Sequence, residues 1–289
     1  GYRWWYIDAL SDDGQHGLTL IAFVGSVFSP YYAWARARGR ADPEDHCGLN
    51  VALYGRRGHR WALTERRRRS IQRSPDAFRV GPSALAWEGD TLVVRIDETT
   101  VPWPSRLRGT VRLDPLALTG HVAVLGARGR HRWWPVAPCA RVDAVFERPA
   151  LRWRGPGYLD SNAGDEPIEQ GFVAWDWSRA AHGAGTTILY DAERRDGSDL
   201  SLALHVDQAG RIEPFTAPPR AALPKTLWRV PRGTRSDADR PARVVATLED
   251  TPFYARSLVT MGLRGEVVTA VHESLSLDRF ATPWVRMLL

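Results

Sequence analysis

Three pairs of side chains with chemical potential are each spaced two positions apart in the sequence. They are His131 and Trp133, Tyr158 and Asp160, and Trp175 and Trp177. Residues two apart on a β-strand point to the same face of the sheet. An acid, an imidazole and several π faces could therefore line one cavity. This combination is suited to forming a carbocation on an apolar substrate.

Tryptophan is unusually frequent in this chain, with 13 copies among 289 residues. Because the indole is large and π-rich, such an excess indicates aromatic-lined pockets or large cores. The stretch from Trp153 to Arg179 carries three of the tryptophans. Trp153, Trp175 and Trp177 are therefore candidates for the wall of a substrate site, with core packing as the alternative.

Each candidate also has a purely structural interpretation. Asp160 could bond its own backbone in an Asx-turn, because residues 157–164 are rich in turn-forming types. Tyr158 could be a packed strand residue, and His131 could be a histidine whose ring is satisfied by neighbouring groups. The spacing alone does not choose between these interpretations and catalysis.

The elements that must position these residues read as many short strands with turn signals between them. Residues 31–38 are expected to form a short helical or irregular crossing, and no helix of three or more turns has a convincing apolar stripe. Strands are expected at residues 2–9, 18–28, 49–54, 60–65, 78–80, 84–87, 91–96, 107–113, 140–146, 151–160, 171–178, 186–193, 200–206, 227–230, 243–248, 254–263 and 266–276.

The predicted fold class is all-β, with two closed or nearly closed antiparallel barrels or sandwiches packed side by side. The strand pattern pauses near Glu147–Ala150. The expected domains are therefore residues 1–148 and 149–289. A barrel of about eight strands can hold one small ligand inside, so we expect the candidate site within a barrel.

The charge balance allows an anionic partner. The chain has 39 basic and 33 acidic residues, for a net charge of +6. Nucleic acid and an anionic membrane surface are both compatible with this balance, as is a simple compositional preference for arginine. The run Arg66–Arg69 is not interleaved with aromatic residues, so we expect a solvated edge, then a membrane contact, and no nucleic-acid partner.

Cysteines and apolar runs exclude other classes. Cys47 and Cys139 are too few for a disulfide framework. The adjacent His46 and Cys47 lack a second pair with ligand spacing, so no metal is expected. No apolar run approaches the roughly 18 residues of a membrane span. No signal peptide is visible, although the chain begins at Gly1 rather than at a methionine.

Several segments, in order along the chain, resemble the carotenoid 1,2-hydratase family, whose members are also called hydroxyneurosporene synthases. They are Ser11–Gly14, Gly25–Tyr32, His131–Pro135, Gly157–Asn162 and Trp175–Ala180. The likeness covers nearly the whole chain. It implies a pair of lipocalin-like barrels, in agreement with the strand count, and an origin in a phototrophic bacterium.

The resemblance also implies a hydro-lyase that needs no cofactor. Such an enzyme adds water to the terminal double bond of acyclic carotenes such as neurosporene and lycopene. The residues that match the family's proposed catalytic site are His131, Trp133, Tyr158 and Asp160. Because the substrate resides in lipid, we expect peripheral contact with the cytoplasmic side of the photosynthetic membrane. The sequence does not indicate an oligomeric state.

These residues suggest a mechanism. Asp160, kept neutral by burial among apolar faces, would protonate the alkene to a tertiary carbocation that water captures. His131 would orient Asp160 or return its proton, and Tyr158 would position water or the carboxyl group. Tryptophan faces such as that of Trp133 would stabilise the cation.

Two other functions remain open from the sequence. A lipocalin-like carrier of carotenoid or other lipid would share the apolar cavity but need no acid. A carbohydrate-binding sandwich would need Trp175 and Trp177 on an exposed face.

Overall fold

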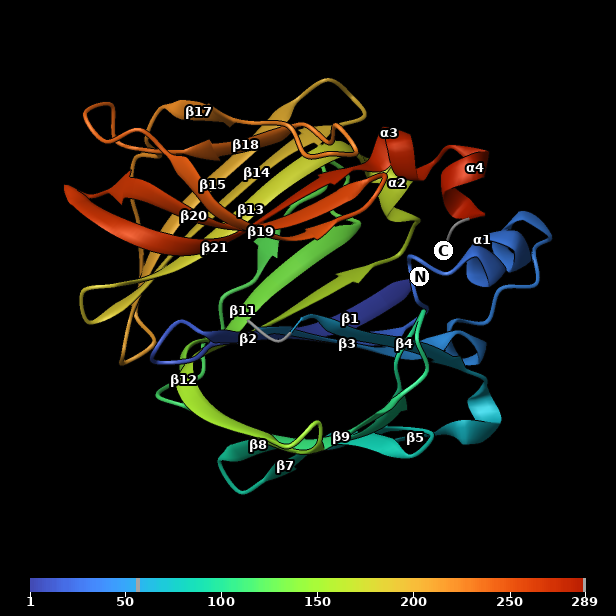
Figure 1. The fold of residues 1–289 in the computed structure, drawn as a ribbon. Coiled ribbons are helices and arrows are strands. Elements are labelled where there is room, and N and C mark those ends of the chain that lie inside the picture. Colours follow the sequence, from blue (N-terminus) through green and yellow to red (C-terminus); the bar gives the residue numbers. More distant parts are fainter. Residues whose placement is uncertain (56–57, 288–289) are drawn as a thin grey trace. The chain divides into compact units, whose positions relative to one another are not determined.

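The computed structural model describes residues 1–55 and 58–287, and antiparallel strands dominate it (Figure 1). The strands are β1 (Tyr2–Leu10), β2 (His16–Val24), β3 (Cys47–Gly55), β4 (Arg60–Arg66), β5 (Ile71–Arg73), β6 (Ala77–Val80), β7 (Ser83–Glu88), β8 (Thr91–Thr99), β9 (Arg106–Pro115), β10 (Ala123–Val124), β11 (His131–Arg148), β12 (Leu151–Gly164), β13 (Phe172–His182), β14 (Gly185–Arg194), β15 (Asp199–Asp207), β16 (Ile212–Pro214), β17 (Arg220–Leu223), β18 (Arg232–Arg235), β19 (Arg243–Asp250), β20 (Tyr254–Leu263) and β21 (Glu266–Ser276). The helices are short: α1 (Pro30–Ala37), η1 (Pro43–Asp45), η2 (Arg68–Ser70), α2 (Ile168–Gly171), α3 (Leu277–Phe280) and α4 (Pro283–Arg286).

The chain forms two compact units. The first comprises Gly1–Val122 and Trp133–Asp165, and the second comprises Ala123–Arg132 and Glu166–Leu289. This division differs from the expected boundary between residues 148 and 149. The reason is that β12, which follows that boundary, lies between β1 and β11 in the sheet of the first unit.

The first unit is a nearly closed barrel made from one sheet, here called sheet A. Its strand order is β4-β3-β2-β1-β12-β11-β9-β8-β7-β6-β5. The sheet curls until Trp61 of β4 pairs with Val101, just beyond β8 (Figure 1). The buried carboxylate of Glu98 in β8 supports this closure by accepting hydrogen bonds from Thr64 of β4 and Ser83 of β7, both at 2.6 Å.

The two faces of sheet A carry different side chains. One face carries an apolar core that includes Ile7 of β1, Leu20 of β2 and Leu159 of β12. In β1 and β12 the core positions are odd-numbered, so the even-numbered positions face the other way. This second face carries Asp160. The candidate acid was expected inside a barrel, but it lies on the face of sheet A that points away from the barrel interior. The barrel interior is instead filled by the apolar core.

The second unit is built on a seven-stranded sheet, here called sheet B, with the order β16-β15-β14-β13-β21-β20-β19. The hairpin β17-β18 adds a small second sheet. Leu223 of β17 packs in a core cluster with Ala180 of β13, Leu189 of β14 and Val259 of β20. The hairpin therefore covers one face of sheet B.

Buried polar groups attach β18 to sheet B. The backbone N–H of Gly233 donates to Asp176 Oδ1 at 3.2 Å, and the Gly233 carbonyl oxygen accepts from His272 Nε2 at 2.7 Å. Asp176 also accepts from the hydroxyl of Ser274, its neighbour across β13 and β21. Asp176 therefore links β13 to β18 and β21.

Most expected strands are present, and the residues 31–38 crossing is helix α1. The expected strand at residues 227–230 is wrong. Leu227 is almost fully exposed, and Arg229 has a φ of 60°, a left-handed conformation that a strand does not contain. The expected strands at residues 49–54 and 60–65 form the antiparallel hairpin β3-β4. Residues 56–57 of its turn lie outside the described residues.

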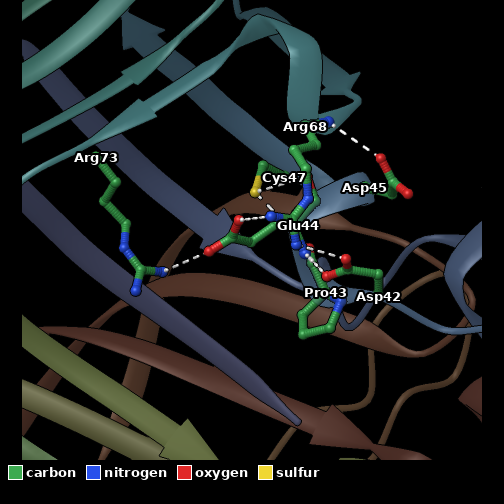
Figure 2. A network of polar contacts seen from close by, with 7 residues as sticks. All are labelled: Asp42, Pro43, Glu44, Asp45, Cys47, Arg68 and Arg73. Atoms are coloured by element: carbon green, nitrogen blue, oxygen red, sulfur yellow. Dashed lines mark hydrogen bonds and ion pairs between the residues drawn. The ribbon is translucent and has the colours of Figure 1, made fainter.

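An acidic network holds the segment between α1 and β3 against the arginine run. Figure 2 shows Arg68 at its centre, with Nη2 at 2.6 Å from Asp42 Oδ2 and Nη1 at 3.1 Å from Glu44 Oε2. The backbone N–H of Arg68 donates to Asp45 Oδ1 at 3.2 Å. Arg68, an exposed member of the run, therefore has acidic partners from its own unit.

No helix among residues 1–55 and 58–287 has both the length and the apolar character needed to cross a membrane.

The pKa values of Asp176 and His272 predict opposite effects on stability. Burial raises the pKa of Asp176 to about 6 and lowers the pKa of His272 to about 4. The reference values are 3.8 and 6.5. Between about pH 4 and 6 the folded state holds a proton on Asp176 that the unfolded state lacks, so this group loses stability as pH rises. His272 is neutral when folded and charged when unfolded, so it gains stability over the same range.

Replacing either group should expose the effect of the other. We expect Asp176→Asn to make stability rise with pH between about 4 and 6, relative to the parent protein, by up to about 1.4 kcal/mol per pH unit. His272→Gln should give the opposite slope. Urea denaturation at several pH values measures both. Equal slopes in the two variants would contradict the assignment.

Candidate active site

The Asp160 carboxyl group is buried and held by two donors. Asp160 is 5% exposed. The hydroxyl of Tyr158 donates to its Oδ2 at 2.9 Å, and the indole N–H of Trp133 donates to the same oxygen at 2.8 Å. The predicted sharing of a face by Tyr158 and Asp160 is confirmed, and Trp133 reaches them from β11. The groups that orient Asp160 in the first unit are therefore a phenol and an indole.

Strand β1 presents a second phenol and carboxyl group beside the first. In the antiparallel register Tyr6 lies opposite Asp160, and Asp8 lies opposite Tyr158. The hydroxyl of Tyr6 donates to Asp8 Oδ2 at 3.0 Å. The rings of Tyr6 and Tyr158 are 6.3 Å apart between centroids in an edge-on arrangement. We call these four side chains the carboxyl–phenol tetrad.

The sequence contained a signal for the tetrad. The tripeptide Tyr-Ile-Asp at residues 6–8 matches Tyr-Leu-Asp at residues 158–160 in type and spacing. Residues 2–9 were expected to form a strand, yet no role was assigned to Tyr6 or Asp8. Two similar tripeptides on neighbouring antiparallel strands place each tyrosine opposite the aspartate of the other.

Aromatic rings extend this face of sheet A beyond the tetrad. Trp4 lies two residues before Tyr6, and its ring stacks on Tyr2 at 4.9 Å between centroids. Phe23 of β2 meets Trp4 edge-on at 6.2 Å. The polar groups of the tetrad thus adjoin a buried, π-rich aromatic cluster.

His131 belongs to the second unit, although Trp133 two residues later belongs to the first. The His131 Nε2 atom lies 3.2 Å from Glu166 Oε1, and the ring lies 4.8 Å from that of Phe172. Glu166 also accepts from Arg128 at 2.9 Å through Oε2. Glu166 was missed by the sequence reasoning, because 35 residues separate it from His131.

The three tryptophans predicted to contact substrate have different environments. Trp175 and Trp177 lie on the face of β13 opposite Asp176, and Trp175 meets Tyr190 edge-on at 6.2 Å. Both tryptophans are buried, so neither is the exposed platform of a carbohydrate-binding sandwich. Trp153 instead packs in the apolar core of the first unit, because it shares the core face of β12 with Leu159.

A cavity of about 490 Å³ opens on the core face of sheet A. Its lining includes Trp5, Phe78, Trp87 and Leu159. Because successive side chains of β12 alternate, Asp160 points away from this cavity. This cavity and the candidate acid are therefore on opposite faces of the same sheet.

The described residues contain no group of three or more His, Cys, Asp or Glu side chains placed to hold a metal ion. At the His46–Cys47 pair, His46 Nδ1 lies 2.7 Å from Glu65 Oε1. Burial raises the pKa of the Cys47 thiol to about 12. Its sulfur lies 3.7 Å from the carbonyl oxygen of Pro43 and 3.6 Å from that of Glu44 (Figure 2).

The fold defines the class of protein as a lipocalin-like β protein. The solved structure of kievitone hydratase from Nectria haematococca matches with a TM-score of 0.62 and 9% sequence identity, over 98% of this chain and 90% of that one. At this identity the similarity concerns the fold alone. It confirms the predicted all-β, lipocalin-like architecture.

Sequence comparisons define the family. The family model described as carotenoid hydratase CrtC matches residues 20–289. A Thiocapsa roseopersicina protein named acyclic carotenoid 1,2-hydratase is 57% identical over 290 residues, which is 100% of this chain and 72% of that protein. A Rubrivivax gelatinosus protein of the same name is 54% identical over 292 residues, with the same shares. The chain belongs to the carotenoid hydratase CrtC family, which confirms the resemblance.

The packing around His131 predicts the effect of a small change that leaves the histidine in place. A Cβ atom on Gly171 would lie 2.5 Å from His131 Nε2. We therefore expect Gly171→Ala to displace the imidazole from Glu166 and to lower hydratase turnover at least about tenfold if His131 serves the reaction. The amount of hydrated product formed per unit time measures the effect.

Gly120 provides the control, because a Cβ atom there meets no other atom within 4 Å. Gly120→Ala should leave turnover unchanged. Full activity of a folded Gly171→Ala variant would remove His131 and its contact with Glu166 from the candidate site.

Proposed function

We propose that this protein adds water across the terminal carbon–carbon double bond of an acyclic carotene such as neurosporene or lycopene, giving a tertiary alcohol. The observation that carries the proposal is the buried Asp160 carboxyl group, which two donors orient on an aromatic face. Membership of the carotenoid hydratase family and the names of the relatives support the choice of substrate.

Asp160 is the proposed acid. An isolated alkene is a poor base, and the enzyme must lower the barrier by at least about 8 kcal/mol to reach the usual range of catalysis. Tyr158 and Trp133 both donate to Oδ2. Hydrogen bonds to a carboxyl group strengthen as it becomes a carboxylate. The two donors therefore stabilise the state that forms when Asp160 has given its proton to the alkene.

The carbocation forms at the more substituted carbon, and aromatic faces stabilise it. A cation over a desolvated ring gains about 2 kcal/mol or more. Trp133 offers such a face beside Asp160, and Trp4 offers another on the same face of sheet A. Water then attacks the cation and loses a proton.

The reaction is a hydration without change of oxidation state, which makes the enzyme a hydro-lyase. It requires one proton donor, one water molecule and one proton acceptor. Protein groups can supply the donor and the acceptor, so cofactor independence is part of the proposal.

Asp160→Asn tests the acid directly. The amide has the shape of the carboxyl group and can still accept from Tyr158 and Trp133, but it cannot give a proton to carbon. We expect hydration to fall at least about 100-fold, within the range of general acid catalysis. The assay uses lycopene in detergent and heavy-oxygen water, with mass spectrometry of the extracted pigment.

Asp12→Asn is the matched control, because Asp12 is exposed and pairs with Arg141 on the surface. It should retain full activity. If a folded Asp160→Asn variant hydrates lycopene at the wild-type rate, Asp160 is not the proton donor. Pigment recovered unchanged from the parent protein would favour a carotenoid carrier instead.

Contact with a membrane surface is a further part of the proposal, because an acyclic carotene resides in lipid. Helix α1 exposes Tyr31 and Trp34, at 71% and 61%. The guanidinium of Arg38 lies 3.6 Å from the centroid of the Trp34 ring. Residues 30–40 carry three arginines and no acidic residue. Aromatic rings beside arginines are typical of helices that lie in the headgroup region of anionic membranes.

Vesicle binding tests this contact. Replacing Tyr31 and Trp34 together by serine should weaken binding to phosphatidylglycerol-containing vesicles at least about tenfold, because burial of one large apolar side chain contributes about 1.5–3 kcal/mol. Salt should weaken binding of the parent protein through the arginines. Trp103→Ser is the control, since Trp103 is also exposed but lies outside α1. Equal losses from both changes would argue against α1 as the contact.

A further inference from the structure

We propose that Asp8 is a second catalytic carboxyl group, which accepts the proton that water loses when it attacks the carbocation. This inference rests on the proposed hydration by Asp160. It divides the two proton transfers of the reaction between two side chains of the carboxyl–phenol tetrad.

The backbone register places Asp8 on the same face as Asp160. Tyr6 pairs with Asp160 and Asp8 pairs with Tyr158 across the β1–β12 ladder. Side chains that are directly opposite on an antiparallel pair share a face, and diagonal neighbours remain within reach of one another. Asp8 and Asp160 are such diagonal neighbours, so a substrate end that touches one carboxyl group lies beside the other.

Burial and hydrogen bonding distinguish Asp8 from the acidic residues of the protein surface. Asp8 is 0% exposed, and Tyr6 holds its Oδ2 at 3.0 Å. Tyr158 holds Asp160 in the same way, at 2.9 Å. Placing a second carboxyl group on a buried face costs free energy unless it is hydrogen-bonded. The core role of β1 is already served by Ile7 and Ala9 on the opposite face, so packing does not require Asp8.

The proton transfers balance with these two groups. The Asp160 O–H bond breaks as a C–H bond forms at the less substituted alkene carbon, and Asp160 becomes a carboxylate. The water oxygen bonds to the cationic carbon, and one water O–H bond breaks as Asp8 takes the proton. Asp8 then releases this proton and Asp160 regains one, which completes the cycle with no net consumption of protons.

Two carboxyl groups separate two steps that one group would have to perform in turn. The carboxylate left on Asp160 can take a proton back from the carbon, which regenerates the alkene. Asp8 can remove a proton only from the attacking water. Loss of Asp8 should therefore stop hydration while the first, reversible proton transfer continues.

The experiment measures hydration and hydrogen exchange together. Parent and variant proteins are incubated with lycopene in D₂O, and the pigment is analysed by mass spectrometry for alcohol and for deuterium in recovered alkene. For Asp8→Asn we expect hydration to fall at least about 100-fold. Deuterium incorporation into the alkene should stay within about threefold of the parent rate. Asp160→Asn should lose both activities.

Three controls make the result decisive. Asp8→Glu keeps a carboxyl group and should regain part of the hydration that Asp8→Asn loses. Asp12→Asn changes a hydrogen-bonded carboxyl group of the same unit, away from the tetrad and from the barrel closure, and should lower neither activity. Circular dichroism and urea denaturation establish that each variant is folded under the assay conditions.

Two outcomes would overturn the assignment of Asp8. One is hydration at the parent rate by Asp8→Asn. The other is a parallel loss of hydration and deuterium incorporation in that variant, which would mean that Asp8 supports the acid or the fold rather than the water. Failure of the proposed function gives a different result, because the parent protein itself would then form no alcohol. Failure of Asp160 as the acid would leave the Asp160→Asn variant with its hydration and exchange activities.

Discussion

The site depends on one interaction above all, the double hydrogen bond that Tyr158 and Trp133 make to Asp160 Oδ2. An aspartate buried without donors would be costly, and an aspartate that rotates freely would deliver its proton poorly. Strand β12 supplies the aspartate and the phenol, while β11 supplies the indole. The hydrogen bonds of neighbouring strands in sheet A thus fix the proposed acid through backbone geometry rather than through a loop.

The strict alternation of β1 and β12 allows this arrangement. Ile7 and Leu159 fill the barrel, and the residues beside them form the tetrad on the other face. Barrel closure through Glu98 keeps the sheet curved and its register fixed without using any group of the tetrad. In the second unit Asp176 and His272 perform a comparable structural task by holding β18. Buried titratable groups therefore support the structure at Glu98, Asp176 and His272, and we propose that Asp160 and Asp8 serve chemistry.

Local sequence patterns predicted what depends on local geometry. The two-residue spacing placed Tyr158 beside Asp160 and Trp175 on the face of Trp177. It could not reveal that Trp153 joins the core or that β11 passes from one unit to the other after Arg132, because both depend on pairing between distant strands. Asp8 was overlooked for the same reason, since its position opposite Tyr158 follows from a register 150 residues apart in the chain. The strand expected at residues 227–230 was wrong because Arg229 adopts a left-handed backbone conformation, and the residue types in this segment do not indicate one.

The two-faced character of β1 has a consequence for the diversification of such enzymes. On the proposed assignment, we expect exchanges at its odd positions to change stability, whereas exchanges at Tyr6 and Asp8 should change the rate of hydration. A directed-evolution experiment could therefore randomise one set of β1 positions while leaving the other set unchanged. Along only nine residues, Tyr2–Leu10, robustness and product yield would be inherited as separable traits.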